Sequence, residues 1–206
     1  MKKLFFIPAA LIAFLTTNAS AAEVKPFAGL SINYSEFDGD DAGMDMVEDK
    51  LSSFTVNAGV HINRFFAIEA FYQKSTNEDK TNTGYQMIAT GNPANVKTKV
   101  KFDAFGIDFK GFLPTSVNSL DVFGSIGVGK YKFKESLIIS DLVTGDALGD
   151  KYDEDNLGFR FGVGAQYRIN NHWSLDLTGR YVKIDNGSED VVEDLGELSL
   201  GVKYSF

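Results

Sequence analysis

The side chains best suited to acid–base chemistry are two histidines, His61 and His172, in a chain of 206 residues. A histidine held between a serine and a carboxylate can activate the serine as a nucleophile for hydrolysis or acyl transfer. The chain contains no cysteine, which excludes disulfides, thiolate nucleophiles, and zinc or iron–sulfur sites with cysteine ligands. Any catalytic role therefore depends on where the fold places the two imidazoles.

Two further patterns suggest ligand binding, and both are incomplete. The acidic stretch 38–49 partly imitates a calcium-binding loop, but Ala42 occupies a ligand position and Asp49 replaces the usual glutamate. The triplets Gly127-Val-Gly129 and Gly162-Val-Gly164 begin like a dinucleotide-binding turn but lack its third glycine and its following helix. We expect no catalytic residue, no cofactor and no specific metal site, and interpret the glycines as inward-facing residues in a crowded interior.

Charged side chains also occur at alternate positions inside otherwise apolar segments. Eight of them are expected to face a common interior: Glu69, Lys110, Asp121, Arg160, Asp176, Arg180, Glu197 and Lys203. The core of a soluble protein rarely accepts so many charges, whereas the lumen of a membrane β-barrel is polar. The charges therefore favour a barrel over a soluble fold.

Eight segments with period-two alternation must position these charges, and such alternation is typical of half-buried strands. The segments cover residues 24–35, 54–63, 66–73, 100–109, 120–129, 157–169, 173–181 and 197–206. In the fourth segment Val100 and Phe102 lie on one parity, whereas Phe105 and Ile107 lie on the other. We interpret this change as a β-bulge between Asp103 and Phe105.

The connections distinguish a soluble β-sandwich, which also alternates, from a membrane barrel. The links at 63–64, 113–119 and 170–171 are tight, whereas long polar stretches follow the first, third, fifth and seventh segments. This asymmetry is typical of outer-membrane barrels. Aromatic residues near the tight turns form an expected interfacial girdle: Phe66, Tyr167, Trp173, Tyr204 and Phe206. The sequence predicts an all-β fold, an eight-stranded antiparallel up-and-down transmembrane β-barrel with short periplasmic turns and long extracellular loops.

An eight-stranded barrel is so narrow that side chains fill it, and its interior charges need partners. Counting from the tight turns places Arg180 level with Glu197 and Asp176 level with Lys203, so we predict both pairs. We also predict a pair between Lys110 and Asp121, which are level if the intervening turn centres on residues 115–116. The expected role of these charges is to hold a polar plug together, with a water path or narrow gate as the alternative.

The N-terminus has the plan of a secretory signal peptide. Two lysines at 2–3 precede an apolar run at 4–15, which is shorter than the roughly 20 residues that a membrane anchor needs. We predict a signal peptide over residues 1–21, with cleavage after Ala21 or Ala22, and one barrel domain over residues 22–206. Without the two lysines, 18 basic residues face 28 acidic ones, a net charge of −10, which disfavours a nucleic-acid partner.

The last seven residues alternate apolar side chains up to a terminal aromatic, with Leu200, Val202, Tyr204 and Phe206 on one parity. This ending resembles the C-terminal β-signal of Gram-negative outer-membrane proteins. With the signal peptide and the eight segments, the chain resembles the small eight-stranded outer-membrane barrels of the OmpA transmembrane domain, OmpX and opacity-protein type. The resemblance implies insertion into the cell outer membrane by the barrel-assembly machinery, which would recognise these four residues as an assembly signal.

Some small outer-membrane barrels are lipid A acyltransferases or deacylases, whose chemistry needs a histidine near the outer leaflet. His61 and His172 both fall near the tight turns, at the opposite face, so we expect no enzyme activity. We expect instead a monomeric structural or interaction protein whose barrel anchors acidic surface loops for membrane integrity or adhesion. Its expected partners are outer-membrane lipid and lipopolysaccharide, which Mg²⁺ or Ca²⁺ would bridge weakly to the loops. The alternative function is a narrow channel or transporter for ions or a small apolar ligand.

Overall fold

The computed structural model describes residues 24–38, 50–76, 78–86, 91–117, 119–144, 147–185 and 194–206. The predicted signal peptide, its cleavage site and most of the calcium-like stretch lie outside the described residues. In the described part, no helix is long and apolar enough to cross a membrane. The strands there are β1 (Lys25–Asp38), β2 (Lys50–His61), β3 (Phe66–Ser75), β4 (Glu78–Gln86), β5 (Pro93–Pro114), β6 (Leu120–Asp141), β7 (Ala147–Arg168), β8 (Trp173–Asp185) and β9 (Asp194–Ser205).

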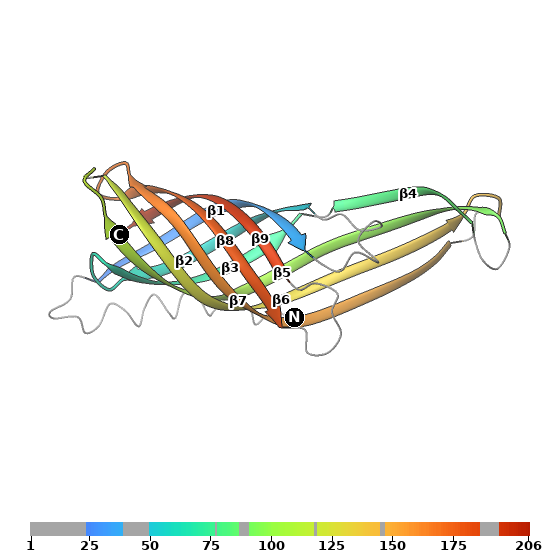
Figure 1. Cartoon of the computed structure of the whole chain (residues 1–206), viewed down its shortest axis with the longest axis horizontal. Helices are drawn as coiled ribbons and strands as arrows, with labels where there is room; N and C mark the ends of the chain where they lie inside the picture. Colours follow the sequence, from blue (N-terminus) through green and yellow to red (C-terminus); the bar gives the residue numbers. More distant parts are fainter. Residues whose placement is uncertain are drawn as a thin grey trace.

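Eight of these strands close into a barrel (Figure 1). Its wall follows the order β3, β2, β1, β9, β8, β7, β6, β5, and antiparallel pairing of β5 with β3 completes the ring. Strand β4 continues the course of β3 along β5 and lies outside the closed wall. The predicted eight-stranded antiparallel barrel is confirmed.

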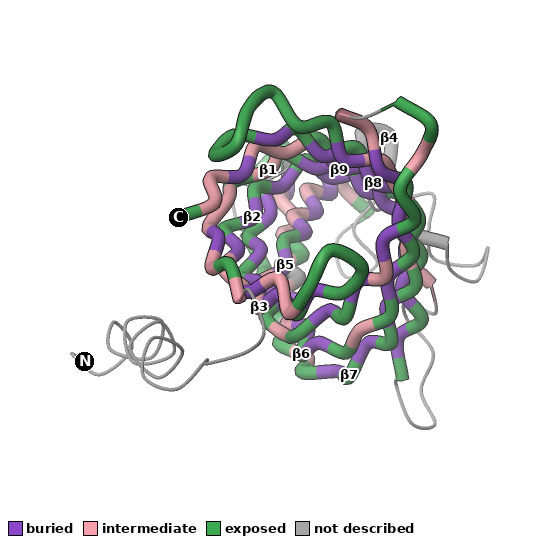
Figure 2. The backbone as a smooth tube through the Cα atoms, turned by 90° about the vertical axis from the view of Figure 1, so that its left-hand side faces the viewer, coloured by how far each residue is buried: buried purple, intermediate pink, exposed green. Residues whose placement is uncertain are grey.

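Successive side chains in the wall alternate between the lumen and the outside. In β2, Leu51 and Ser53 are buried, whereas Phe54 and Val56 point outward and are each 46% exposed. Figure 2, a view from the end of the barrel, shows the same alternation of buried and exposed positions along the wall. Apolar side chains on the outside of a membrane barrel contact lipid, so these exposed positions mark the hydrocarbon belt.

Side-chain hydrogen bonds build two of the tight turns. Asn63 Oδ1 accepts the N–H groups of Phe65 at 2.7 Å and Phe66 at 2.9 Å. Asn170 Oδ1 does the same for His172 and Trp173, both at 2.9 Å. An asparagine that accepts backbone N–H groups in this way stabilises a tight reversal of the chain, which is why both predicted turns form where expected.

Strands β5, β6 and β7 each contain 22 residues, about twice the 9–11 that cross a bilayer. Their far halves leave the barrel and form, with β4, a projecting antiparallel sheet (Figure 1), which we call the extension. The expected long polar loops after the third and fifth segments are thus mostly strand. Asp150, Asp153 and Asp155, expected in a loop, lie on β7, because cross-strand pairing of β6 with β7 continues to Ser140 and Ala147.

The predicted bulge between Asp103 and Phe105 is wrong. The register of β5 against β6 runs without a shift along the whole of β5, and its register against β3 is also regular. The change of apolar parity has another cause. Phe105 and Ile107 face outward in the hydrocarbon belt, whereas Val100 and Phe102 point inward and are buried at the mouth of the barrel. The parity switch therefore marks the level at which β5 leaves the membrane.

Candidate functional site

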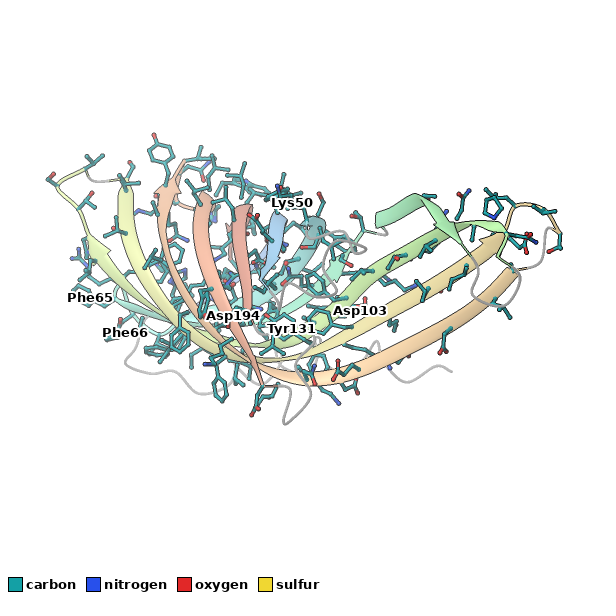
Figure 3. The ribbon with its side chains drawn as sticks, turned by 45° about the vertical axis from the view of Figure 1, so that its right-hand side comes forward. Lys50, Phe65, Phe66, Asp103, Tyr131 and Asp194 are labelled. Carbon is teal, nitrogen blue, oxygen red and sulfur yellow. The ribbon has the colours of Figure 1, made fainter. Side chains whose placement is uncertain are left out.

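The barrel lumen holds the charged residues and is filled in three layers. Along β5, the inward side chains are Phe112 near the turns, then Lys110 and Asp108, then Phe102 at the far mouth. The turn-side layer consists of Phe27, Ala67, Phe112 and Phe123. The mouth layer consists of Leu51, Phe71, Val100, Phe102, Ala104, Tyr131, Phe133, Val182, Ile184 and Leu195. Figure 3 shows Tyr131 at the end of the barrel where β5 to β7 continue into the extension.

The turn-side half of the polar layer is a chain of ion pairs. Lys203 Nζ lies 2.7 Å from Glu69 Oε2 and 2.6 Å from Asp176 Oδ2. Glu69 also pairs with Lys110 at 3.0 Å, and Asp176 accepts a hydrogen bond from Gln166 at 2.9 Å. All four charged residues are buried. Two lysines and two carboxylates make this group neutral, as buried charges require.

The mouth-side half of the polar layer contains two arginines and two carboxylates. Arg180 pairs with Glu197, which also accepts a hydrogen bond from Gln73. Arg160 Nε lies 3.1 Å from Asp108 Oδ1, a contact whose angles fall outside hydrogen-bond geometry. The Arg160 guanidinium also stacks 3.4 Å from the centroid of the Phe71 ring and donates to the Tyr131 hydroxyl at 3.3 Å. This group is neutral too, and Phe71 and Tyr131 tie it to the apolar mouth layer.

The structure places all eight sequence-predicted charges inward, with seven of the residues buried and the Arg180 side chain 7% exposed. It pairs Arg180 with Glu197 and Asp176 with Lys203, as the spacing predicts. The expected pair between Lys110 and Asp121 is wrong. The β5–β6 turn centres two residues later than assumed, so Lys110 lies opposite Ser125. Asp121 pairs instead with Arg168, nearer the turns.

Sequence reasoning missed two lumen residues that complete the network, namely Asp108 and Tyr131. Asp108 is 1% exposed and Tyr131 is 0% exposed. The inward position of Asp108 could have been predicted, because Asp108 lies between the outward residues Ile107 and Phe109. The same alternation predicted the inward position of Lys110. Tyr131 carries no such signal, because an aromatic residue beyond the belt gives no indication of whether it faces a lumen.

Inward glycines make room for the network, as the crowded-interior interpretation predicts. A Cβ at Gly127 would lie 2.0 Å from Asp108 Oδ1, and a Cβ at Gly158 would lie 2.6 Å from the Tyr131 ring. Real Cβ atoms do not approach neighbours so closely, so larger residues would displace the carboxylate or the ring. The glycines are therefore required for packing.

The lumen leaves little room for solutes. A cavity of about 20 Å³ lies within the polar layer, lined by Glu69, Arg160 and Lys203 among others. A space of that size holds about one water molecule. On the turn side, a vestibule of about 1180 Å³ opens outward, with His61, Arg168 and Lys203 in its lining. Phe27, Phe112 and Phe123 are buried at this end of the lumen, and Lys203 lines both the vestibule and the small cavity.

Both histidines lie at the turn-side end. The His61 ring packs 4.9 Å from the Phe27 ring, measured between centroids, and 5.5 Å from the Phe112 ring. His172 Nδ1 lies 3.0 Å from the backbone oxygen of Ser205. Over the described ranges, no group of three or more His, Asp or Glu side chains is arranged to hold a metal ion.

The proposed assembly signal, Leu200, Val202, Tyr204 and Phe206, lies at the C-terminal end of β9, the last strand of the wall. Leu200 points outward and is 52% exposed. The Tyr204 ring contacts the rings of Trp173 at 5.0 Å and Phe206 at 5.2 Å, between centroids. The Phe206 N–H donates to the backbone oxygen of Pro26 at 3.0 Å. The last residue is thus held to β1, and the aromatic rings near it contact one another.

A family model described as "Outer membrane protein beta-barrel domain" matches residues 7–206. Two relatives, from Brucella melitensis and Brucella suis, carry the name "31 kDa outer-membrane immunogenic protein". Each is 30% identical over 126 residues, which cover 57% of this chain and 51% of the relative. This chain therefore spans about half the length of those proteins.

Three solved structures share the fold. Neisserial surface protein A has a TM-score of 0.58 at 16% identity and covers 88% of this chain and 97% of its own. OprG from Pseudomonas aeruginosa has a TM-score of 0.52 at 15% identity, covering 90% and 96%. Ail, the attachment invasion locus protein of Yersinia pestis, has a TM-score of 0.50 at 15% identity, covering 90% and 99%.

Proposed function

The chain belongs to the outer membrane protein beta-barrel domain family, and on that premise we propose that it is a non-catalytic structural and interaction protein. In this proposal the barrel anchors the extension and the acidic loops at the cell surface, where they serve membrane integrity or adhesion. A cleaved signal peptide over residues 1–21 would direct the chain to the outer membrane, where it would reside as a monomer.

The filled lumen is the observation that carries the proposal. The polar layer consists of two neutral groups of buried ion pairs, and its cavity of about 20 Å³ holds about one water. Apolar clusters pack at both ends of the lumen, and among the described residues only the turn-side end of the polar layer, at Lys203, lines the open vestibule. A conducting pore needs a continuous wet path, so this interior favours an anchor over the alternative function of a narrow channel or transporter.

The shape and surface of the extension support an interaction role. Its tip exposes Leu142 (58%), Val143 (69%) and Leu148 (63%) to solvent. Exposed apolar groups that gather at one place favour contact with another surface. The name of the Brucella relatives, which calls them immunogenic, also suits a protein exposed at the cell surface.

The proposal includes partners in biogenesis and in the membrane. The barrel-assembly machinery would recognise Leu200, Val202, Tyr204 and Phe206 during insertion. Outer-membrane lipid would surround the hydrocarbon belt, and divalent cations would bridge the acidic loops to lipopolysaccharide phosphates. The proposal includes no cofactor and no nucleic-acid partner.

Planar-bilayer recording with the purified, folded chain tests the anchor against the channel. We expect no reproducible single-channel steps, since the lumen is filled. Gel mobility before and after boiling would verify that the recorded protein is folded. Regular steps from folded protein would overturn the anchor in favour of the channel.

Adhesion is tested separately on cells that display the protein. We expect Leu142→Ser with Val143→Ser to reduce attachment to host cells or matrix, with surface levels unchanged. Thr144→Ser, in the same turn, is the matched control. Unchanged attachment of the tip variant would refute the role assigned to the tip.

A further inference from the structure

The outward faces of β5 and β6 change character where they leave the hydrocarbon belt. Their last outward apolar residues in the belt are Phe105 and Val128, and lysines occupy most of the next outward positions. With the neighbouring outward positions of β3 and β7 they form a surface that we call the lysine face: Lys74, Lys97, Lys99, Lys101, Lys130, Lys132, Lys134 and Lys151. These are eight of the 20 basic residues in a chain of net charge −8. Positive charge is therefore concentrated on one side of the molecule.

The register of the sheet aligns the lysine face in rows. One row across β3, β5, β6 and β7 consists of Lys74, Asp103, Lys132 and Asp155. In the next row outward, Lys101 lies directly opposite Lys134. Like charges directly opposed on one face destabilise an antiparallel pair. An anion held between the two ammonium groups would offset that repulsion.

Aspartates neutralise only part of the lysine face. Three ion pairs span 2.9 to 3.4 Å: Lys130 with Asp155, Lys132 with Asp153, and Lys134 with Asp103. Their side chains are 28–57% exposed, and exposed pairs of this kind contribute little and exchange readily. In the rows around Lys101 and Lys134, five lysines (Lys74, Lys101, Lys130, Lys132 and Lys134) share the face with three aspartates (Asp103, Asp153 and Asp155), an excess of two positive charges.

The lysine face begins at the level of the lipid headgroups and rises above it. The polar layer of each leaflet is about 5 to 7 Å thick, and successive outward residues on a strand tilted by about 45° rise about 5 Å. Lys130 is the first outward residue beyond Val128, and Lys101 is the second beyond Phe105. Lys134 is the third outward residue beyond Val128. At about 5 Å for each outward residue, Lys130, Lys101 and Lys134 lie about 5, 10 and 15 Å above the belt. Figure 3 shows Asp103, between Phe105 and Lys101, at the root of the extension.

We propose that the lysine face binds the phosphate groups of lipopolysaccharide in the outer leaflet, with one phosphate held between Lys101 and Lys134. The face is continuous with the hydrocarbon belt, so a ligand seated on it lies against the bilayer surface. Clusters of basic side chains beside a membrane attract anionic headgroups, and ammonium–phosphate contacts are charge-assisted hydrogen bonds. The inference rests on the proposed placement of the barrel in the outer membrane and is separate from the role of the acidic loops.

The test uses the full-length, folded protein in micelles of an uncharged maltoside detergent. Diphosphorylated lipid A is titrated into the isotope-labelled protein, and the backbone amide signals of β5 and β6 report binding. Parallel titrations use dephosphorylated lipid A and inorganic phosphate. The test variant is Lys101→Gln with Lys134→Gln. The control variant is Lys50→Gln with Lys183→Gln, which removes the same charge from exposed lysines on β2 and β8.

We expect saturable binding of diphosphorylated lipid A with signal changes at residues 101 and 134. A lysine beside an anionic surface contributes about 1 kcal/mol, or about fivefold in affinity. The test variant should therefore lose about 25-fold, and the control variant less than about twofold. Equal binding of dephosphorylated lipid A, equal loss in the control variant, or saturation by inorganic phosphate alone would each overturn the proposal. Gel mobility of the unheated protein shows whether the barrel is folded. If the protein is folded but does not bind lipid A, only the proposal for the lysine face is refuted, and the proposed barrel fold and placement stand.

Discussion

Replacing Lys203 with methionine would remove the central cation of the turn-side ion group. Lys203 is 4% exposed, and its Nζ contacts Glu69 at 2.7 Å and Asp176 at 2.6 Å. Methionine keeps most of the side-chain length but carries no charge, so Lys203→Met leaves two carboxylates with one lysine. The expected loss of stability therefore comes from uncompensated buried charge rather than from lost volume.

The size of the loss follows from the contacts that survive. Removing one partner of a buried ion pair costs about 3 to 5 kcal/mol. Glu69 keeps Lys110 at 3.0 Å, and Asp176 keeps the hydrogen bond from Gln166 at 2.9 Å. Each carboxylate thus retains a partner, so we expect the lower end of the range, about 3 kcal/mol.

A second substitution separates charge from packing. Asp176→Asn added to Lys203→Met restores neutrality, because Glu69 and Lys110 then balance each other. We expect the double variant to lose only about 1 to 2 kcal/mol, less than Lys203→Met alone. Lys183→Met, an exposed lysine on β8, is the control and should change stability by less than about 0.5 kcal/mol.

Urea titration of the barrel in phosphatidylcholine vesicles measures these differences. Trp173, the single tryptophan, reports unfolding by fluorescence, and unheated gel mobility reports it independently. A Lys203→Met barrel as stable as wild type would refute the reasoning. So would a double variant that is less stable than Lys203→Met.

Two substitutions, each with a control, and one deletion test the belt, the lumen and the chain end. Phe161→Arg should cost about 2 to 4 kcal/mol if Phe161 contacts lipid near mid-membrane, whereas arginine at the inward-facing Ser174 beside the vestibule should cost less; equal losses in urea titration would contradict lipid contact. Gly127→Ala should cost about 1 to 3 kcal/mol, because its Cβ would lie 2.6 Å from a backbone oxygen of β5. Gly124→Ala faces outward, 4.0 Å from the nearest heavy atom, and should be near neutral; a reversed order in the same titration would refute the packing role. Deleting Phe206 should reduce surface-labelled barrel more than it destabilises assembled barrel, and normal surface levels would argue against an assembly signal.

The period-two alternation in the sequence was enough to predict, for most strand residues of the wall, which face they lie on. The face on which a strand residue lies is a local property, because neighbouring side chains point to opposite sides. The inward positions of Glu69 and Arg160, and the outward positions of Phe105 and Phe161, could therefore be predicted without knowing any partner strand. The turns at Asn63 and Asn170 are local in the same sense.

Pair identity and the extent of the strands needed the tertiary structure. The partner of a side chain depends on the strand register. Because the β5–β6 turn lies two residues later than assumed, Lys110 pairs with Glu69 and not with Asp121. In β5 the apolar residues change from the outer face to the inner face at Val100 and Phe102, and this change was misread as a bulge. Alternation shows which residues are apolar but not where the membrane ends. The extension formed from segments with loop-like composition, since backbone pairing between the consecutive strands β4 to β7 stabilises them. Local patterning determined the side to which each residue points, and only long-range pairing decided which side chain it meets there.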